Sequence, residues 1–143
     1  MWTARGAFVS LICLFSVFIA MSQSASKARN EKGAYLLSPN DDDYQEFLWK
    51  AIKHINEKND NTKHLVPVKV TKAEMLLVSG SLFTFDIELA ESEHEKNNVA
   101  HDQLKELSQA PKEGAHHYVY EIKIWSQPWQ NFEEYTILSS KQL

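Results

Sequence analysis

The sequence predicts an α+β protein in which one long α-helix packs on a curved antiparallel β-sheet of four to five strands. Three observations support this fold class: one helical stripe of apolar residues, several stretches of alternating apolar and polar residues, and their order along the chain. The helical stripe comes first and the alternating stretches follow it. A chain of 143 residues is long enough for one hydrophobic core but not for two.

The predicted helix covers Tyr44 to about Lys58. Its apolar residues recur at helical spacing and form one stripe, which consists of Tyr44, Phe47, Leu48, Ala51, Ile52 and Ile55. Trp49 is next to this stripe, and we expect it at the edge of the buried face. The acidic residues 41–43 favour a helix N-terminus, because they complement the helix dipole. The polar residues 59–61 end the helix.

The residues 65–89 read as one long β-hairpin with its tip near Gly80. Apolar and polar residues alternate in 65–71 and again in 83–89, which is typical of half-buried strands. The turn between them is Leu76-Leu77-Val78-Ser79-Gly80-Ser81, in which glycine permits a positive φ. Three branched apolar residues lead into this turn, and exposed apolar groups at a loop tip are unusual unless they contact something.

Two more strands are predicted at about 117–125 and 133–138, separated by Ser126-Gln127-Pro128-Trp129-Gln130. Residues 33–37 form either a short first strand or an extended arm. The polar stretch 91–114 is a long connection that holds a short helix near 102–107. In an up-and-down meander, the tip at 76–81 and the tip at 126–130 lie at one end of the sheet, with the long connection at the other. The two tips then form a composite apolar edge.

The N-terminal residues 1–25 are predicted to be a signal peptide. Arg5 precedes an uncharged, mostly apolar run from Ala7 to Ala20, and small residues place cleavage near residue 22 or 25. The alternative is a membrane anchor, but the run is shorter than the roughly 20 apolar residues that span a bilayer. We therefore expect a secreted, extracellular protein whose domain is 26–143, with no membrane partner once the signal is removed.

Removal of this segment changes the chemistry available to the chain. Loss of Arg5 leaves 14 basic against 19 acidic residues, a net charge of −5, which disfavours nucleic acid or an anionic membrane as the main partner. Cys13, the only cysteine, is also lost. The mature chain would then have no disulfide, no cysteine nucleophile and no thiolate metal site.

Three motifs in order resemble those of the secreted cystatins, which inhibit papain-like cysteine proteases, and the similarity looks greatest to those of nematodes. The family pattern is a glycine in an N-terminal arm, a Gln-x-Val-x-Gly first hairpin and a Pro-Trp second hairpin. Here Gly33 fits the first, the segment Leu76-Leu77-Val78-Ser79-Gly80 the second, and Pro128-Trp129 the third. The resemblance covers the whole mature chain.

The resemblance implies a cystatin-like fold and a reversible, non-covalent inhibitor with no cofactor and no enzymatic activity of its own. The arm and both hairpins would enter the cleft of a cathepsin-type protease together and block it. The residues that would bind the protease are Gly33, Leu76, Leu77, Val78, Ser79, Gly80, Pro128 and Trp129.

The chain also departs from the family pattern. Leu76 replaces the glutamine of the first hairpin, Ser79 replaces an alanine or glycine, and Lys32 precedes Gly33. The two cysteines that usually close the loop after the third strand appear as His94 and about Leu107. The alternative to an inhibitor is therefore a cystatin-fold protein that has lost inhibition and serves as an extracellular interaction or regulatory module.

Some secreted cystatins carry a second site against legumain-type endopeptidases, in the loop after the helix. The corresponding residues here are Asn59 or Asp60, depending on the alignment, and a polar helix terminator is the favoured interpretation. A metal site is not expected. The six histidines are scattered, and His116 and His117 would point to opposite faces of a strand. The acidic residues 41–43 are read as a helix cap rather than a calcium site.

Overall fold

The computed structural model describes residues 27–107 and 109–143. The predicted signal peptide therefore lies outside the described residues. Within them, no helix is both long and apolar enough to cross a membrane. The elements in chain order are β1 (Tyr35–Leu36), α1 (Asp42–Lys58), β2 (Lys63–Val78), β3 (Gly80–Glu95), α2 (His101–Leu104), β4 (His117–Gln127), η1 (Pro128–Gln130) and β5 (Phe132–Gln142).

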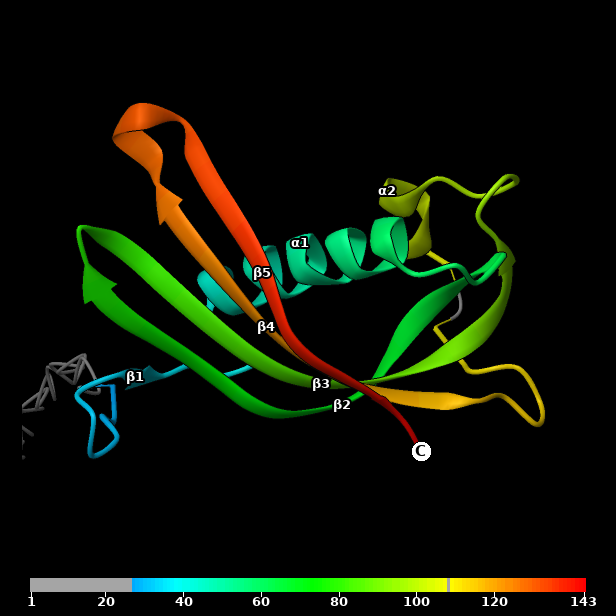
Figure 1. The fold of residues 1–143 in the computed structure, drawn as a ribbon, viewed down its shortest axis with the longest axis horizontal. Helices are drawn as coiled ribbons and strands as arrows, with labels where there is room; N and C mark the ends of the chain where they lie inside the picture. The colour runs from blue at the N-terminus through cyan, green and yellow to red at the C-terminus, as the bar shows by residue number, and fades with distance from the viewer. Residues whose placement is uncertain (1–26, 108) are drawn as a thin grey trace, which may run out of the picture.

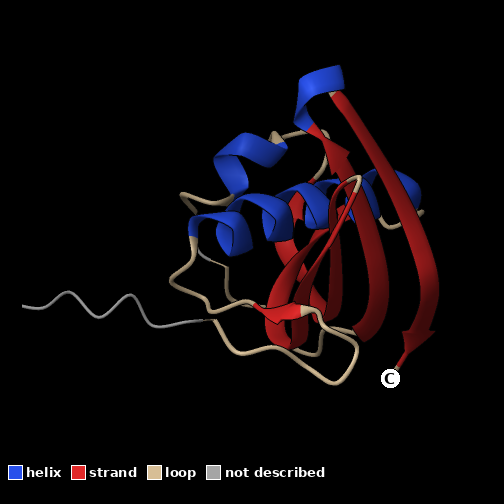
Figure 2. Ribbon diagram, turned by 90° about the vertical axis from the view of Figure 1, so that its left-hand side faces the viewer, coloured by secondary structure: helices blue, strands red, loops and turns tan. Residues whose placement is uncertain are grey.

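The predicted α+β fold is confirmed. The five strands form one antiparallel sheet in which the spatial order follows the chain order, β1 to β5. The sheet curves around α1, which runs across its concave side (Figures 1 and 2). The up-and-down meander predicted from the order of the alternating stretches is therefore present, with β1 as a short additional strand at one edge.

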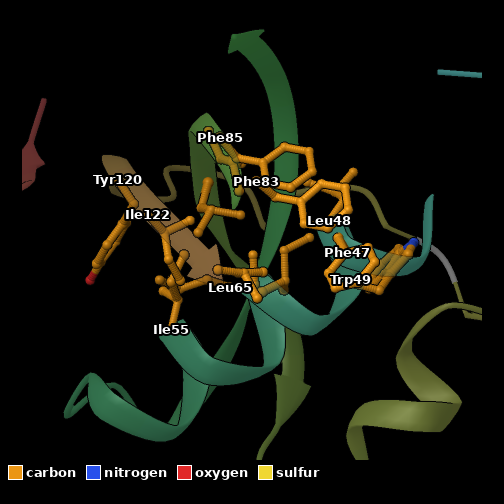
Figure 3. Packing of buried hydrophobic residues seen from close by; sticks show 14 of the residues in the cluster. Phe47, Leu48, Trp49, Ile55, Leu65, Phe83, Phe85, Tyr120 and Ile122 are labelled. Carbon is orange, nitrogen blue, oxygen red and sulfur yellow. The ribbon is translucent and has the colours of Figure 1, made fainter. Parts of the chain in front are cut away.

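The core lies between α1 and the concave face of the sheet. Ala51, Ile52 and Ile55 on the helix are fully buried, and the helix side chains point toward those of the strands (Figure 3). Phe47 stacks on Phe83 with ring centroids 3.8 Å apart. Burial of each such side chain stabilises the fold by about 1.5–3 kcal/mol, so the helical stripe is the main anchor of the helix.

Trp49 is buried rather than at the edge of the helix face, so that expectation was wrong. The reason is α2, which covers the indole from the far end of the core. The ring centroid of His101 is 5.9 Å from that of Trp49, and Lys105 Nζ is 5.5 Å from the Trp49 ring centroid. Because α2 arrives from a distant part of the chain, helical periodicity alone did not predict it.

The strands are longer than the alternation predicted. β3 runs to Glu95, so residues 91–95 belong to the sheet and not to the connection. Ser92 in this stretch is fully buried, and its hydroxyl donates a hydrogen bond to the carbonyl of His64 (2.7 Å). β5 likewise continues past the predicted end at 138 to Gln142. The buried positions of β3 change from Leu89 to Ala90 and Ser92, so the alternation that predicts the strand does not continue into this stretch.

The outer edge of β2 is irregular. β1 pairs with only two of its residues, Met75 and Glu74. The pairing of β2 with β3 also shifts register three times between Lys63 and Lys72. Pro67 lies within this irregular stretch and has no backbone N–H to donate. Most of this edge is therefore neither paired by another strand nor regular.

The connection between β3 and β4 is held by side chains, with no disulfide within the described residues. Leu104 is fully buried in the core. Lys112 Nζ lies 2.6 Å from Glu91 Oε2, and the hydrogen bond from Lys112 holds the pKa of Glu91 below its usual value. His64 Nε2 lies 2.6 Å from the carbonyl of Val99. Packing and polar contacts thus anchor the connection at several points.

Stability is expected to fall as the pH drops from about 7.5 to about 5.5. Burial, reinforced by Lys53, lowers the pKa of His101 below the ordinary 6.5, and burial with Lys58 lowers that of His54. The unfolded chain therefore takes up protons at a higher pH than the folded chain, which favours unfolding through and below pH 6.5. Thermal denaturation across this range should therefore show a Tm that falls as the pH drops.

The variant His101→Gln tests the origin of this pH dependence, because glutamine keeps a polar side chain that does not titrate. Its Tm should vary less between the two pH values than that of the parent protein. An equal change of Tm with pH in the two proteins would show that His101 does not contribute to the pH dependence of stability. The pKa values of the carboxylates Glu91 and Glu133 are also lowered. Their protonation changes the free energy of unfolding only below about pH 4.5, so they do not contribute between about pH 7.5 and 5.5.

Candidate binding edge

The two hairpin tips lie at one end of the molecule and the long β3–β4 connection lies at the other (Figure 1). This arrangement confirms the topology inferred from the sequence. We define the binding edge as residues 77–79 of the first tip together with residues 128–130 of the second. The two tips come from separate hairpins of one rigid sheet, so the edge is formed before any partner arrives.

The first tip is a tight turn with Ser79 at its apex. Val78 pairs with Gly80 on the two sides of this residue, and Gly80 has a φ of +97°. Leu77 and Val78 are 59% and 48% exposed. The sequence predicted exposed apolar residues here, and the structure places them at the tip.

Leu76 lies further from the tip than the sequence analysis implied. It is half-buried, pairs with Leu82 on the neighbouring strand, and lines a hollow of about 210 Å³ together with Lys32. Its side chain thus packs within the molecule as well as facing solvent. A role of Leu76 in protease contact stays a prediction.

The second tip presents the most exposed large apolar side chain of the described residues, Trp129, at 64% exposure. Pro128 opens a short 3-10 turn, η1, and Asn131 closes it with a φ of +49°. The Trp129 side chain is not part of the hydrophobic core. Trp129 is therefore a surface residue of the second tip.

Hydrogen bonds join the first tip to the end of β4, just before the second tip. The carbonyl of Ser79 accepts from the indole Nε1 of Trp125 (2.9 Å) and from the amide Nε2 of Gln127 (2.9 Å). A Cβ added to Gly80 would lie 2.2 Å from the carbonyl oxygen of Ser126, so the hairpins approach closely at this point. Sequence reasoning missed the roles of Trp125 and Gln127, because these contacts join residues far apart in the chain.

Gly33 lies in a turn of the N-terminal arm, which folds back on itself. Its φ is +80°, its N–H donates to the carbonyl of Asn30 (3.0 Å), and the Asn30 amide donates to Glu74 Oε1 (2.9 Å). Since Tyr35 pairs antiparallel with Met75, the chain before Tyr35 heads toward the first tip. The arm therefore lies beside the first hairpin (Figure 1).

The two residues considered for a legumain-type site lie in the loop that follows α1. Asn59 is the C-cap of α1, and its Nδ2 donates to the carbonyl of Ile55 (2.9 Å). Its Oδ1 accepts from Lys96 Nζ (2.8 Å) and from the N–H of Asn61 (3.0 Å). Both ends of the amide are thus occupied, as in a helix terminator, whereas Asp60 is exposed.

The chain belongs to the cystatin family. The family model of the cystatin domain matches residues 33–125, which include β1, α1, the first hairpin and most of β4. The matched range includes Gly33 and the segment Leu76-Leu77-Val78-Ser79-Gly80, whereas Pro128-Trp129 and β5 lie beyond its last residue.

Nematode cystatins are among its relatives. The chain is 29% identical to cystatin cpi-1 of Caenorhabditis elegans over 96 residues, which cover 66% of this chain and 69% of that protein. It is 28% identical to onchocystatin of Onchocerca volvulus over 106 residues, which cover 73% of this chain and 64% of that protein. The crystal structure of Al-CPI superposes with a TM-score of 0.66 at 25% identity, covering 78% of this chain and 99% of that one.

Proposed function

We propose that this protein is a secreted, reversible and non-covalent inhibitor of papain-like cysteine proteases of the cathepsin type. Cystatins in general inhibit cysteine proteases, and this chain has the cystatin domain. The observation that supports the proposal most is the binding edge itself. Leu77, Val78 and Trp129 are exposed at two tips on the same end of the sheet, and the first tip is hydrogen-bonded to β4, the strand that leads into the second. Large apolar side chains that are exposed together at one end of a rigid sheet indicate a surface that a partner covers.

The mechanism follows from the geometry of the edge. Two tips on one sheet can enter a cleft as a single wedge, with little conformational entropy lost on docking because the turns are already ordered. Trp129 is the kind of aromatic anchor that contributes most of the affinity in protein interfaces. The wedge blocks access of substrate to the protease, and no bond is made or broken in this inhibitor.

Titration of the purified chain 26–143 into papain and into a cathepsin L-type enzyme, with a fluorogenic peptide substrate, tests the proposal. The rate should fall in a dose-dependent manner and recover on dilution, which separates reversible inhibition from covalent inactivation. A serine protease assayed in parallel should be unaffected. Unchanged cysteine-protease rates at about 10 μM protein would instead support the alternative, a cystatin-fold interaction module without inhibitory activity.

A legumain-type partner is a weaker candidate and needs its own assay. Because the Asn59 amide is held by intramolecular hydrogen bonds, exposed Asp60 is the residue of this loop that is free to face a protease. Inhibition of an asparaginyl endopeptidase by the parent protein, lost in Asp60→Ala and retained in Trp129→Ala, would establish a second and independent site.

A further inference from the structure

We propose that Trp125 and Gln127 are positioning residues that clamp the first hairpin tip to β4, the strand that leads into the second tip, and thereby set the affinity of the binding edge. The proposal rests on the proposed function, because it concerns how the same edge is kept ready for a protease. We call the two donors and their shared acceptor, the carbonyl of Ser79, the tip clamp.

The acceptor of the tip clamp is a group that the sheet itself leaves unpaired. Ser79 stands alone at the apex, since its neighbours Val78 and Gly80 pair with each other. Its carbonyl receives two donors at 2.9 Å each, and Gln127 Nε2 also lies 3.3 Å from the Ser79 hydroxyl. A backbone carbonyl has two lone pairs, so both of its acceptor positions are used.

The donors of the tip clamp are themselves held in place. Gln127 is 8% exposed, and the Trp125 ring packs edge-on against Phe132 with centroids 5.5 Å apart. Both donors lie on β4, in the stretch where the strand leads into the second tip. The close approach of Gly80 to the Ser126 carbonyl brings the two hairpins near enough for these hydrogen bonds to form.

The tip clamp also explains how a first tip without the usual glutamine keeps its shape. Leu76 has no hydrogen-bonding side chain, so it cannot hold the turn from within its own strand. The donors come from the neighbouring hairpin instead. The clamp uses the carbonyl of Ser79, and Leu77 and Val78 remain as the exposed apolar side chains of the turn. This geometry favours a protease whose cleft wall is apolar where it meets the first tip.

The variants Gln127→Met and Trp125→Phe each remove one donor while keeping a side chain of similar shape. The control is Gln142→Met, which makes the same chemical change at the exposed end of β5, outside both the binding edge and the tip clamp. Two properties are measured for each variant: amide hydrogen exchange at residues 77–80 in the free protein, and the inhibition constant against papain. The Tm of each variant is recorded alongside.

Loss of one donor should raise the exchange rates at the first tip and the inhibition constant by about fivefold to tenfold, the value of one net hydrogen bond. Exchange in the core of the sheet should stay the same, and Gln142→Met should match the parent protein in both exchange and inhibition constant. A general loss of stability would raise exchange throughout the sheet, which distinguishes a positioning role from a structural one.

Unchanged tip exchange in both donor variants would overturn the tip clamp, whatever the inhibition constants. Faster exchange at the first tip with an unchanged inhibition constant would show that the tip clamp does not set the affinity. If the parent protein does not inhibit papain at all, the proposed function and the effect on affinity fail together. The exchange measurement still decides in that case whether Trp125 and Gln127 hold the tip.

Discussion

Substitution of Trp129 by alanine is expected to weaken protease binding by about 2–4 kcal/mol, which is about 30-fold to 1000-fold in the inhibition constant. The side chain is 64% exposed on a turn that begins with Pro128, so the loss is of partner contact. The Tm of the variant should equal that of the parent protein within a few degrees, because the core cluster does not include Trp129.

Trp49→Ala is the matched control, since it makes the same substitution at a tryptophan that is 7% exposed. This variant should lose about 3–5 kcal/mol of unfolding free energy, while the fraction that stays folded still inhibits. Thermal denaturation and protease titration of both variants separate the two effects. A large drop in Tm for Trp129→Ala, comparable to that of Trp49→Ala, would contradict its assignment to the binding edge.

Substitution of Gly80 by alanine is expected to disturb both hairpins at once. An L-residue at a φ of +97° costs about 1–2 kcal/mol, and the added Cβ would lie 2.2 Å from the carbonyl oxygen of Ser126. The obstructing atom belongs to the backbone, so the hairpins themselves must move apart. We expect a loss of about 2–5 kcal/mol in unfolding free energy and an inhibition constant raised at least about tenfold as the tips separate.

Gly114→Ala provides the control for the backbone contribution. Gly114 has a φ of +69°, but an added Cβ would meet no atom within 4 Å. The variant Gly114→Ala should therefore lose only the free energy that a positive φ costs an alanine. It should inhibit the protease as well as the parent protein does. Chemical denaturation gives the stability, and protease titration gives the inhibition constant. Equal losses for the two glycine variants would show that the close approach of the hairpins is unimportant.

The elements with one strongly apolar face could be predicted from the sequence. The helix stripe from Tyr44 to Ile55 and the alternation in Phe83-Phe85-Ile87-Leu89 report burial on one side, and burial is what the periodicity measures. The ends of the strands could not be predicted in this way. Ser92 in β3 is buried but has the polar side chain of a typical loop residue, and β5 beyond Leu138 is polar because it lies at an exposed edge.

The candidate site was likewise predictable only in part. The exposure of Leu77, Val78 and Trp129 followed from apolar residues at turns, which sequence shows directly. The tip clamp did not, because its hydrogen bonds join residues 46 and 48 positions apart in the chain. Such contacts depend on how close two hairpins come, and no local pattern in the sequence records that distance.

The free edge of β2 bears on whether copies of this protein can associate through their sheets. An unpaired strand edge is a template on which another chain can add a strand, and this is a common route to aggregation and fibrils. Here β1 covers only Met75 and Glu74. The remainder is interrupted by register shifts, by Pro67, which offers no N–H, and by lysines at 63, 69 and 72. This edge is therefore irregular and positively charged, which makes it a poor template for the addition of a strand from another chain.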